Sequence, residues 1–226
     1  MKKWILPLIA ALPALNAGCL LFSNFQSARL LPKGEHRVVP SSGASFYVND
    51  LGQTTVIVPA GVRVDFAPSS RCGISINEGW YATRGKDDED NPRMNVFNSG
   101  GIETKIGLAR DKTALSFLLN YHCGGGKYSQ SLQMGTKLIR SFYLASGIDI
   151  TVTPHWGYIF SGYEGPYAGV HLGLGIPLGR GGEIRPEIGV ANIDWNNEWY
   201  ASAGIGIAIP GISSLSKRKG TEQGPL

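Results

Sequence analysis

Apolar and polar residues alternate along most of the chain, in runs of about ten residues between positions 36 and 209. Successive side chains of a β-strand point to opposite faces, so each run predicts a strand with one apolar and one polar face. The clearest runs are 147–160, 166–178 and 198–209. We predict ten strands, with eight as the main alternative count: 36–49, 54–66, 72–82, 98–109, 113–123, 129–140, 147–160, 166–178, 183–192 and 198–209.

The connections between these predicted strands alternate in length. One side has the short turns 67–71, 110–112 and 179–182. The other side has the long, charged connection 83–97 together with 124–128 and 161–165, whereas 141–146 is a longer connection on the short side. Short periplasmic turns and longer external loops are typical of transmembrane barrels, and an even strand number places both chain ends in the periplasm.

The two predicted strand faces differ in polarity. The apolar face is rich in aliphatic and aromatic residues, and the other is rich in Gly, His, Ser and charge. In lipid, a barrel turns its apolar side chains outward and its polar ones inward. We therefore predict an all-β fold, a single closed antiparallel transmembrane β-barrel. Its lumen carries a polar network of Arg63, Asp65, Glu103, Lys105, Asp149, His155, His171, Arg185 and Glu187.

The composition agrees with a strand-rich membrane protein. The 226 residues include 31 glycines, charged residues make up 17%, and the mean hydropathy is −0.04. Alternating strands dilute the hydropathy of a barrel, so a neutral mean is compatible with a membrane location. The formal charge of +4 does not indicate a basic surface for binding nucleic acid.

Residues 1–18 have the features of a bacterial signal peptide. Lys2 and Lys3 form a basic start, an apolar stretch runs from Trp4 to Leu15, and small residues follow. The apolar stretch is shorter than the roughly 20 residues that a membrane-spanning helix needs. We expect this segment to be removed on export.

Leu15-Asn16-Ala17-Gly18-Cys19 resembles the lipobox of bacterial lipoproteins. This resemblance implies that Cys19 becomes the acylated N-terminus, although Asn16 replaces the usual apolar residue; the alternative is simple cleavage nearby. Leu20 follows in place of the Asp that retains lipoproteins at the inner membrane, which favours the outer membrane. Residues 19–35 then form a lipidated tether, and the layout of the chain resembles small bacterial outer-membrane β-barrel lipoproteins of uncharacterised function.

The last predicted strand contains a second resemblance. The stretch 202–209, Ser-Ala-Gly-Ile-Gly-Ile-Ala-Ile, is similar to the C-terminal strand signal that the barrel-assembly machinery recognises, but it lacks a terminal Phe. The resemblance implies that machinery as a partner, beside membrane lipids. Residues 210–226 are a polar tail that we expect to be disordered.

Candidate chemistry is sparse. His155 and His171 fall on the polar face of adjacent strands, where they suit a hydrogen-bonded lumen better than a metal pair, because no further ligands have metal-site spacing. Cys72 and Cys123 are predicted at opposite ends of the barrel, too far apart for a disulfide. The glycines 124–126 lack the Lys-Ser/Thr of a phosphate loop, and the acidic stretch 87–90 lacks the Gly and Glu of a calcium loop.

These patterns favour a structural or surface-interaction barrel in the bacterial outer membrane, with a side-chain-filled lumen and with 83–97 and 161–165 as contact loops. No catalytic motif, metal site or cofactor is predicted, and the oligomeric state stays open. Three alternatives remain at this point: a narrow pore for small solutes, a membrane-embedded lipid hydrolase, and a soluble periplasmic barrel that binds a ligand.

Overall fold

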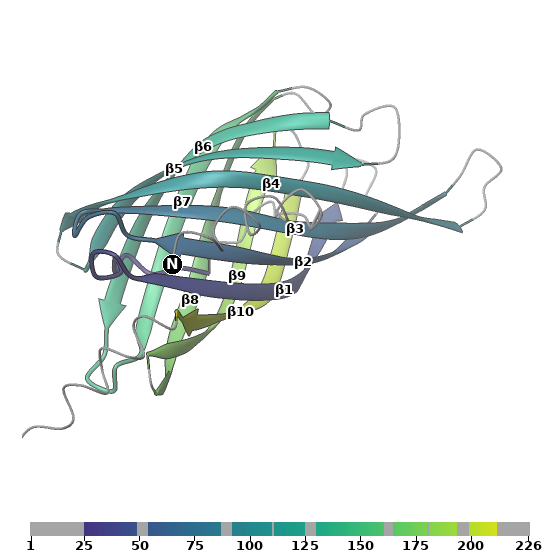
Figure 1. Cartoon of the computed structure of the whole chain (residues 1–226). Helices are drawn as coiled ribbons and strands as arrows, with labels where there is room; N and C mark the ends of the chain where they lie inside the picture. Colours follow the sequence, from purple (N-terminus) through teal and green to yellow (C-terminus); the bar gives the residue numbers. More distant parts are fainter. Residues whose placement is uncertain are drawn as a thin grey trace, which may run out of the picture.

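The computed structural model describes residues 25–48, 54–86, 92–109, 111–124, 130–160, 165–179, 181–193 and 199–211. These residues form one closed antiparallel barrel of ten strands, in which consecutive strands pair and β1 pairs with β10 (Figure 1). The strands are β1 (His36–Val48), β2 (Thr54–Phe66), β3 (Cys72–Lys86), β4 (Pro92–Ala109), β5 (Thr113–Gly124), β6 (Gln130–Tyr143), β7 (Asp149–Phe160), β8 (Gly165–Gly179), β9 (Gly182–Ile193) and β10 (Trp199–Pro210). No helix in these ranges is long and apolar enough to cross a membrane.

The predicted closed barrel of ten strands is confirmed, and the alternative count of eight is wrong. The register closes the sheet fully, because β1 pairs with β10 from Arg37↔Pro210 to Val48↔Trp199. Such closure leaves no sheet edge along the wall, which a membrane-spanning sheet requires.

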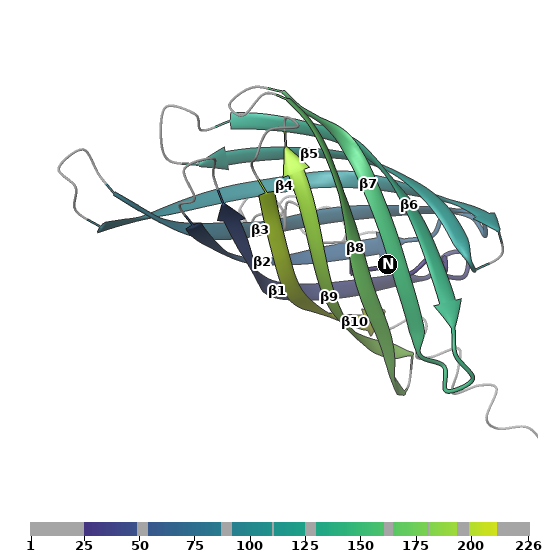
Figure 2. The same ribbon diagram turned by 180° about the vertical axis from the view of Figure 1, so that it is seen from behind.

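The main difference from the sequence prediction lies in β3 and β4. The connection predicted at 83–97 is largely strand, because Thr83–Lys86 and Pro92–Phe97 belong to the β3–β4 pair and only residues 87–91 join them. β2 stops pairing with β3 at Thr83, and β5 stops pairing with β4 at Phe97. The pair therefore continues beyond the barrel wall as a two-stranded ribbon (Figures 1 and 2). Away from the wall the ribbon needs no apolar alternation, so the sequence pattern does not mark it.

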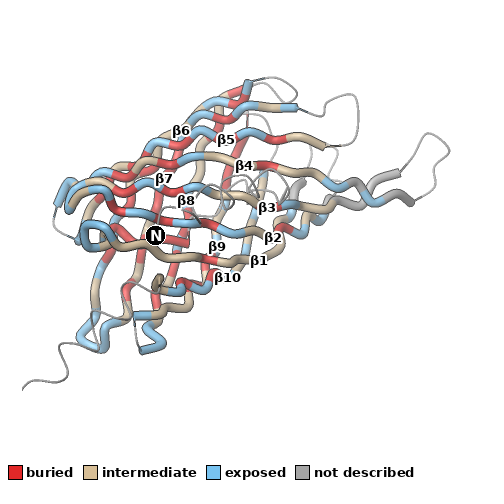
Figure 3. Tube along the Cα trace, in the orientation of Figure 1, coloured by how far each residue is buried: buried red, intermediate tan, exposed pale blue. Residues whose placement is uncertain are grey.

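The orientation of the two strand faces is as predicted. Trp156 and Ile205 are 47% and 46% exposed, whereas Asp149 and Glu187 are 4% and 5% exposed. Figure 3 shows buried and exposed positions alternating along the strands. The outward apolar side chains form what we call the belt, which includes Phe46, Val62, Ile76, Ile102, Leu119, Met134, Trp156, Leu172, Ile188 and Ile205. An apolar outside around a polar inside is the arrangement of a transmembrane barrel and the reverse of a water-soluble one.

One end of the barrel, here called the turn end, carries the connections 67–71, 110–112, 144–148 and 180–181, and the chain enters β1 and leaves β10 there. These connections have two to five residues and those of the opposite end four or five, so the predicted contrast in length is much smaller than expected. The tightest turn joins β8 to β9, where Gly179 and Gly181 have φ angles of +75° and +83°. Glycine adopts this region without the steric penalty that a Cβ brings. The opposite end, which carries the β3–β4 ribbon, is called the far end.

Candidate functional site

The candidate site is the lumen, because the nine polar residues predicted to line it are all buried there. Their exposed fractions are 9% or less. The structure adds inward-facing partners that the sequence prediction did not include: Arg37, Ser116, Lys137, Ser141, Thr151 and Glu183.

Arg185 of β9 makes the most extensive polar contacts of the wall. Its Nη2 lies 2.5 Å and 2.6 Å from the two carboxylate oxygens of Asp149 on β7, and its Nε donates to Glu183. β8 lies between these strands, and a Cβ at Gly175 would lie within 2.3 Å of both charged groups. Because Gly175 has no side chain, the ion pair between Arg185 and Asp149 can lie directly against the backbone of β8.

Two further ion-pair groups lie at the same end. Asp65 accepts hydrogen bonds from Arg37 at 2.6 Å and from Arg63 at 2.7 Å. Glu103 receives Lys137 Nζ at 3.0 Å and a hydrogen bond from Ser116. Buried charges need such partners, because an uncompensated charge removed from water is costly.

The inward-facing charges of the described strands balance. Five are cationic and five are anionic: Arg37, Arg63, Lys105, Lys137 and Arg185, with Asp65, Glu103, Asp149, Glu183 and Glu187. They lie in the half of the barrel nearest the turn end, because each stands within seven residues of a turn-end strand terminus. A charge-selective pore presents an excess of one sign, so this arrangement suits a filled interior better.

Residues that precede β1 fill this charged half. Phe25, Gln26, Ser27 and Ala28 are all buried, with exposed fractions of 4% or less. Phe25 N donates to Glu187 at 2.8 Å, and Gln26 Nε2 donates to Glu103 at 2.5 Å. The stretch predicted only as part of a tether thus lies inside the barrel, and we call residues 25–31 the inner segment.

The remaining contacts of the inner segment go mostly to its main chain. Arg63 Nη2 donates to the carbonyl of Phe25 at 2.8 Å, and Lys105 Nζ donates to the carbonyls of Ser27 and Arg29 at 3.1 Å each. The amide of Ala28 donates to Ser141 Oγ at 2.8 Å. Side chains of the wall therefore hold the main chain of the segment, as in peptide recognition.

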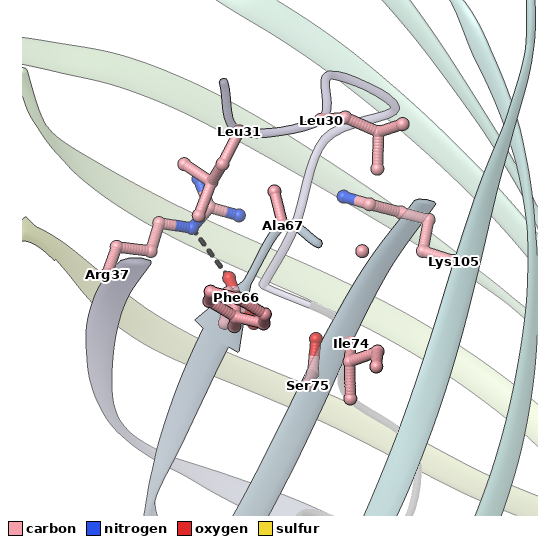
Figure 4. A pocket seen from close by; sticks show the side chains of 10 residues that line it. Leu30, Leu31, Arg37, Phe66, Ala67, Ile74, Ser75 and Lys105 are labelled. Atoms are coloured by element: carbon pink, nitrogen blue, oxygen red, sulfur yellow. Dashed lines mark hydrogen bonds and ion pairs between the residues drawn. The ribbon is translucent and has the colours of Figure 1, made fainter. Parts of the chain in front are cut away.

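Glycines of the wall make room for the apolar side chains of the inner segment. A Cβ at Gly204 or Gly206 would lie 2.8–3.0 Å from Phe25, which packs with Val39 and Ala208. Leu30 lies over Gly73 on β3, where a Cβ would be 3.2 Å from its methyl carbon. Figure 4 shows Leu30 and Leu31 beside Lys105 and Arg37, around a cavity of about 10 Å³. The inward glycines are the sequence signal that could have located the segment.

Towards the far end, the inward-facing residues that the structure describes include no Asp, Glu, Lys or Arg. His155 and His171 border the charged half, because His155 pairs with Lys137 and His171 Nδ1 lies 4.0 Å from Glu187; the two rings stack with centroids 4.6 Å apart. No group of three potential metal ligands occurs in the described ranges. Both rings are buried on the inward face, so neither presents a catalytic nitrogen to lipid.

Cys72 and Cys123 occupy opposite ends of the barrel. Cys72 pairs with Ile106 of β4, and Cys123 pairs with Asn98 of the same strand. At about 3.3 Å per residue these positions are roughly 26 Å apart, beyond the reach of a disulfide. Five predictions fall outside the described residues: the signal peptide, lipidation of Cys19, the acidic stretch 87–90, the contact loop at 161–164 and the tail from residue 212.

No protein-family model matches the chain, and no curated protein matches its sequence. Among solved structures, an outer-membrane channel from Pseudomonas putida F1 is similar, with a TM-score of 0.51 and 8% identity over 84% of this chain and 100% of the other. The translocator domain of the autotransporter NalP from Neisseria meningitidis has a TM-score of 0.47 and 10% identity, over 90% and 93% of the two chains. The P. putida likeness concerns the fold, a closed antiparallel barrel.

Proposed function

We propose that this chain is an outer-membrane barrel lipoprotein whose lumen is closed and whose role is structural or lies in contacts at the cell surface. One observation carries the proposal: the inner segment occupies the lumen and is hydrogen-bonded to strands on opposite sides of it. The balanced charges around it support the same conclusion, since they form ion pairs with each other.

The belt supports insertion in a bilayer. Its aliphatic and aromatic side chains occur on all ten strands, so the apolar surface encircles the barrel. Apolar surface of this extent is not stable in water, whereas in hydrocarbon it is the expected exterior. We place both termini in the periplasm, because the two shortest connections, 110–112 and 180–181, lie at the end where β1 begins and β10 ends.

The β3–β4 ribbon is the proposed contact surface. Among the described residues, its backbone edges beyond Thr83 and Phe97 have no strand partner in β2 or β5. Met94 and Val96 on the ribbon are 72% and 52% exposed. Exposed apolar side chains beside open strand edges are typical of surfaces that bind another chain.

Planar-bilayer recording tests the closed lumen. The purified, folded full-length protein, checked by heat-modifiable gel migration, is expected to insert without producing steady single-channel steps. Steady steps from the unaltered protein would instead support the narrow-pore alternative and contradict the proposed role.

A further inference from the structure

We propose that the inner segment is a displaceable plug, and that its removal from the lumen converts the closed barrel into a water-filled pore. This inference rests on the membrane-spanning, closed barrel proposed above. It adds a latent transport activity and an internal binding site for a short peptide.

The inner segment crosses the lumen from one side to the other. Phe25 N contacts Glu187 on β9, and the next side chain, Gln26, contacts Glu103 on β4. In the closed order of strands, β4 and β9 are five positions apart, which is the largest separation that a ring of ten permits. The segment therefore bridges opposite walls of the charged half.

The ion pairs of the wall do not bridge the lumen in this way. Arg185 and Asp149 lie two strands apart, as do Lys137 and Glu103. Ten strands about 4.8 Å apart and tilted by about 40° enclose a cylinder of roughly 10 Å radius to the backbone. Contacts between strands two positions apart stay close to that wall, so they leave the centre to the inner segment.

Side chains nearer the far end also follow the wall, because they lie over glycines. The hydroxyl of Tyr167 would be 2.0 Å from a Cβ at Gly135 and 2.7 Å from one at Gly157. Asn120 covers Gly101 in the same way and bonds to its neighbour Gln133 at 3.2 Å. Tyr167 and Asn120 therefore lie against the wall and do not extend across the lumen.

The way the inner segment is bound makes it removable. Five of its hydrogen bonds use main-chain groups, and the wall groups that hold them, Glu187, Arg63, Lys105 and Ser141, are polar and can be hydrated when the segment leaves. The ion pairs Arg37–Asp65 and Arg185–Asp149 join residues of the wall alone, so they do not depend on the segment. A cavity of about 450 Å³ at the turn end borders Ala28 and Leu30, so the segment adjoins free volume at the mouth.

The test compares the full-length protein with the double variant Phe25→Asp and Ala28→Asp. These substitutions place two carboxylates in buried apolar sites and are expected to displace the inner segment. Phe25 packs against Val39 and Ala208, and Ala28 against Ala114 and Ile139. The matched control is Lys33→Asp, at an exposed position of the same connection. In planar bilayers we expect steady single-channel steps from the double variant and none from the wild type or the control.

A synthetic peptide with the sequence of residues 25–32 provides the second measurement. Added on the turn-end side, it is expected to block the open variant in a concentration-dependent manner, and the same peptide with Asp in place of its Phe is expected not to block. Gly206→Val is an independent way to displace the inner segment, because the valine side chain would occupy the space that Phe25 fills.

The proposal would be overturned if the double variant and Gly206→Val both fold, as judged by heat-modifiable migration, and neither produces single-channel steps. That result would leave the proposed closed barrel unaffected. Failure of both to fold would also overturn it, since the segment would then be an obligatory core. Steps from the wild type itself would instead contradict the proposed closed barrel, so the two failures are distinguishable.

Discussion

Replacing Arg185 by Met is the sharpest test of the ion pairs in the wall. The Arg185 side chain is 1% exposed and makes two hydrogen bonds to Asp149, at 2.5 Å and 2.6 Å, and one to Glu183. Methionine retains most of the volume but leaves the buried carboxylate of Asp149 without its cation. Removing one partner of a buried pair typically costs about 3–5 kcal/mol. We expect about 3 kcal/mol here, because Thr151 Oγ1 still donates a hydrogen bond to the Asp149 carboxylate at 2.7 Å.

The assay is urea unfolding of the protein in lipid vesicles, followed by the heat-modifiable folded band. With a urea dependence of roughly 1–3 kcal/mol per molar, a loss of about 3 kcal/mol lowers the midpoint by about 1–3 M. The matched control is Arg140→Met, since Arg140 is exposed and lies over the ring of Phe142. Exposed interactions of this kind contribute about 1 kcal/mol or less.

A double variant with Arg185→Met and Asp149→Asn completes the experiment. Neutralising the orphaned carboxylate removes the main cost, so this variant is expected to be more stable than Arg185→Met alone. The reasoning is refuted if Arg185→Met lowers the midpoint no more than Arg140→Met does. A double variant no more stable than the single one also refutes it.

Three further predictions concern the anchor, the belt and the topology. Cys19→Ser is expected to abolish incorporation of radiolabelled fatty acid while leaving heat-modifiable migration unchanged; retained label disproves acylation at Cys19. Glu78 projects outward from β3 opposite Val62 and Gly100. A carboxylate that faces hydrocarbon is unfavourable, so Glu78→Gln is expected to raise the free energy of unfolding in vesicles by about 1 kcal/mol and the urea midpoint with it. A lower midpoint argues for a cationic partner. With Cys72 and Cys123 changed to Ser, Met94→Cys is expected to react with an impermeant maleimide on intact cells, and Lys33→Cys only after permeabilisation; the reverse pattern inverts the topology.

The barrel was predictable because its strands obey one simple rule. Alternation places Trp156 and Ile205 on the lipid side and Asp149 and Glu187 on the inside, and every strand of the wall repeats that rule. The β3–β4 ribbon was missed because its residues between 83 and 97 lie beyond the wall, where no apolar face is required. Pairing with each other holds these residues as strands, and pairing leaves no periodic signal in a single sequence.

The inner segment was missed for a different reason. Residues 25–31 contain too few residues for a periodic pattern, and their partners Glu187, Glu103 and Ser141 are more than 70 positions away in sequence. The polar network of the lumen was accordingly predicted as side chains that satisfy each other. Arg63 and Lys105 in fact donate to main-chain carbonyls of the segment as well. Glycines at 204 and 206 carried the missing information, since they mark where another group approaches the wall.

The position of Phe25 has a consequence for closure of the barrel. Its neighbours Val39 and Ala208 belong to β1 and β10, the first and last strands made during synthesis. The ring therefore touches both sides of the junction that closes the cylinder. The apolar site of Phe25 is therefore complete only when the first and last strands are paired, so packing of the ring favours the closed cylinder.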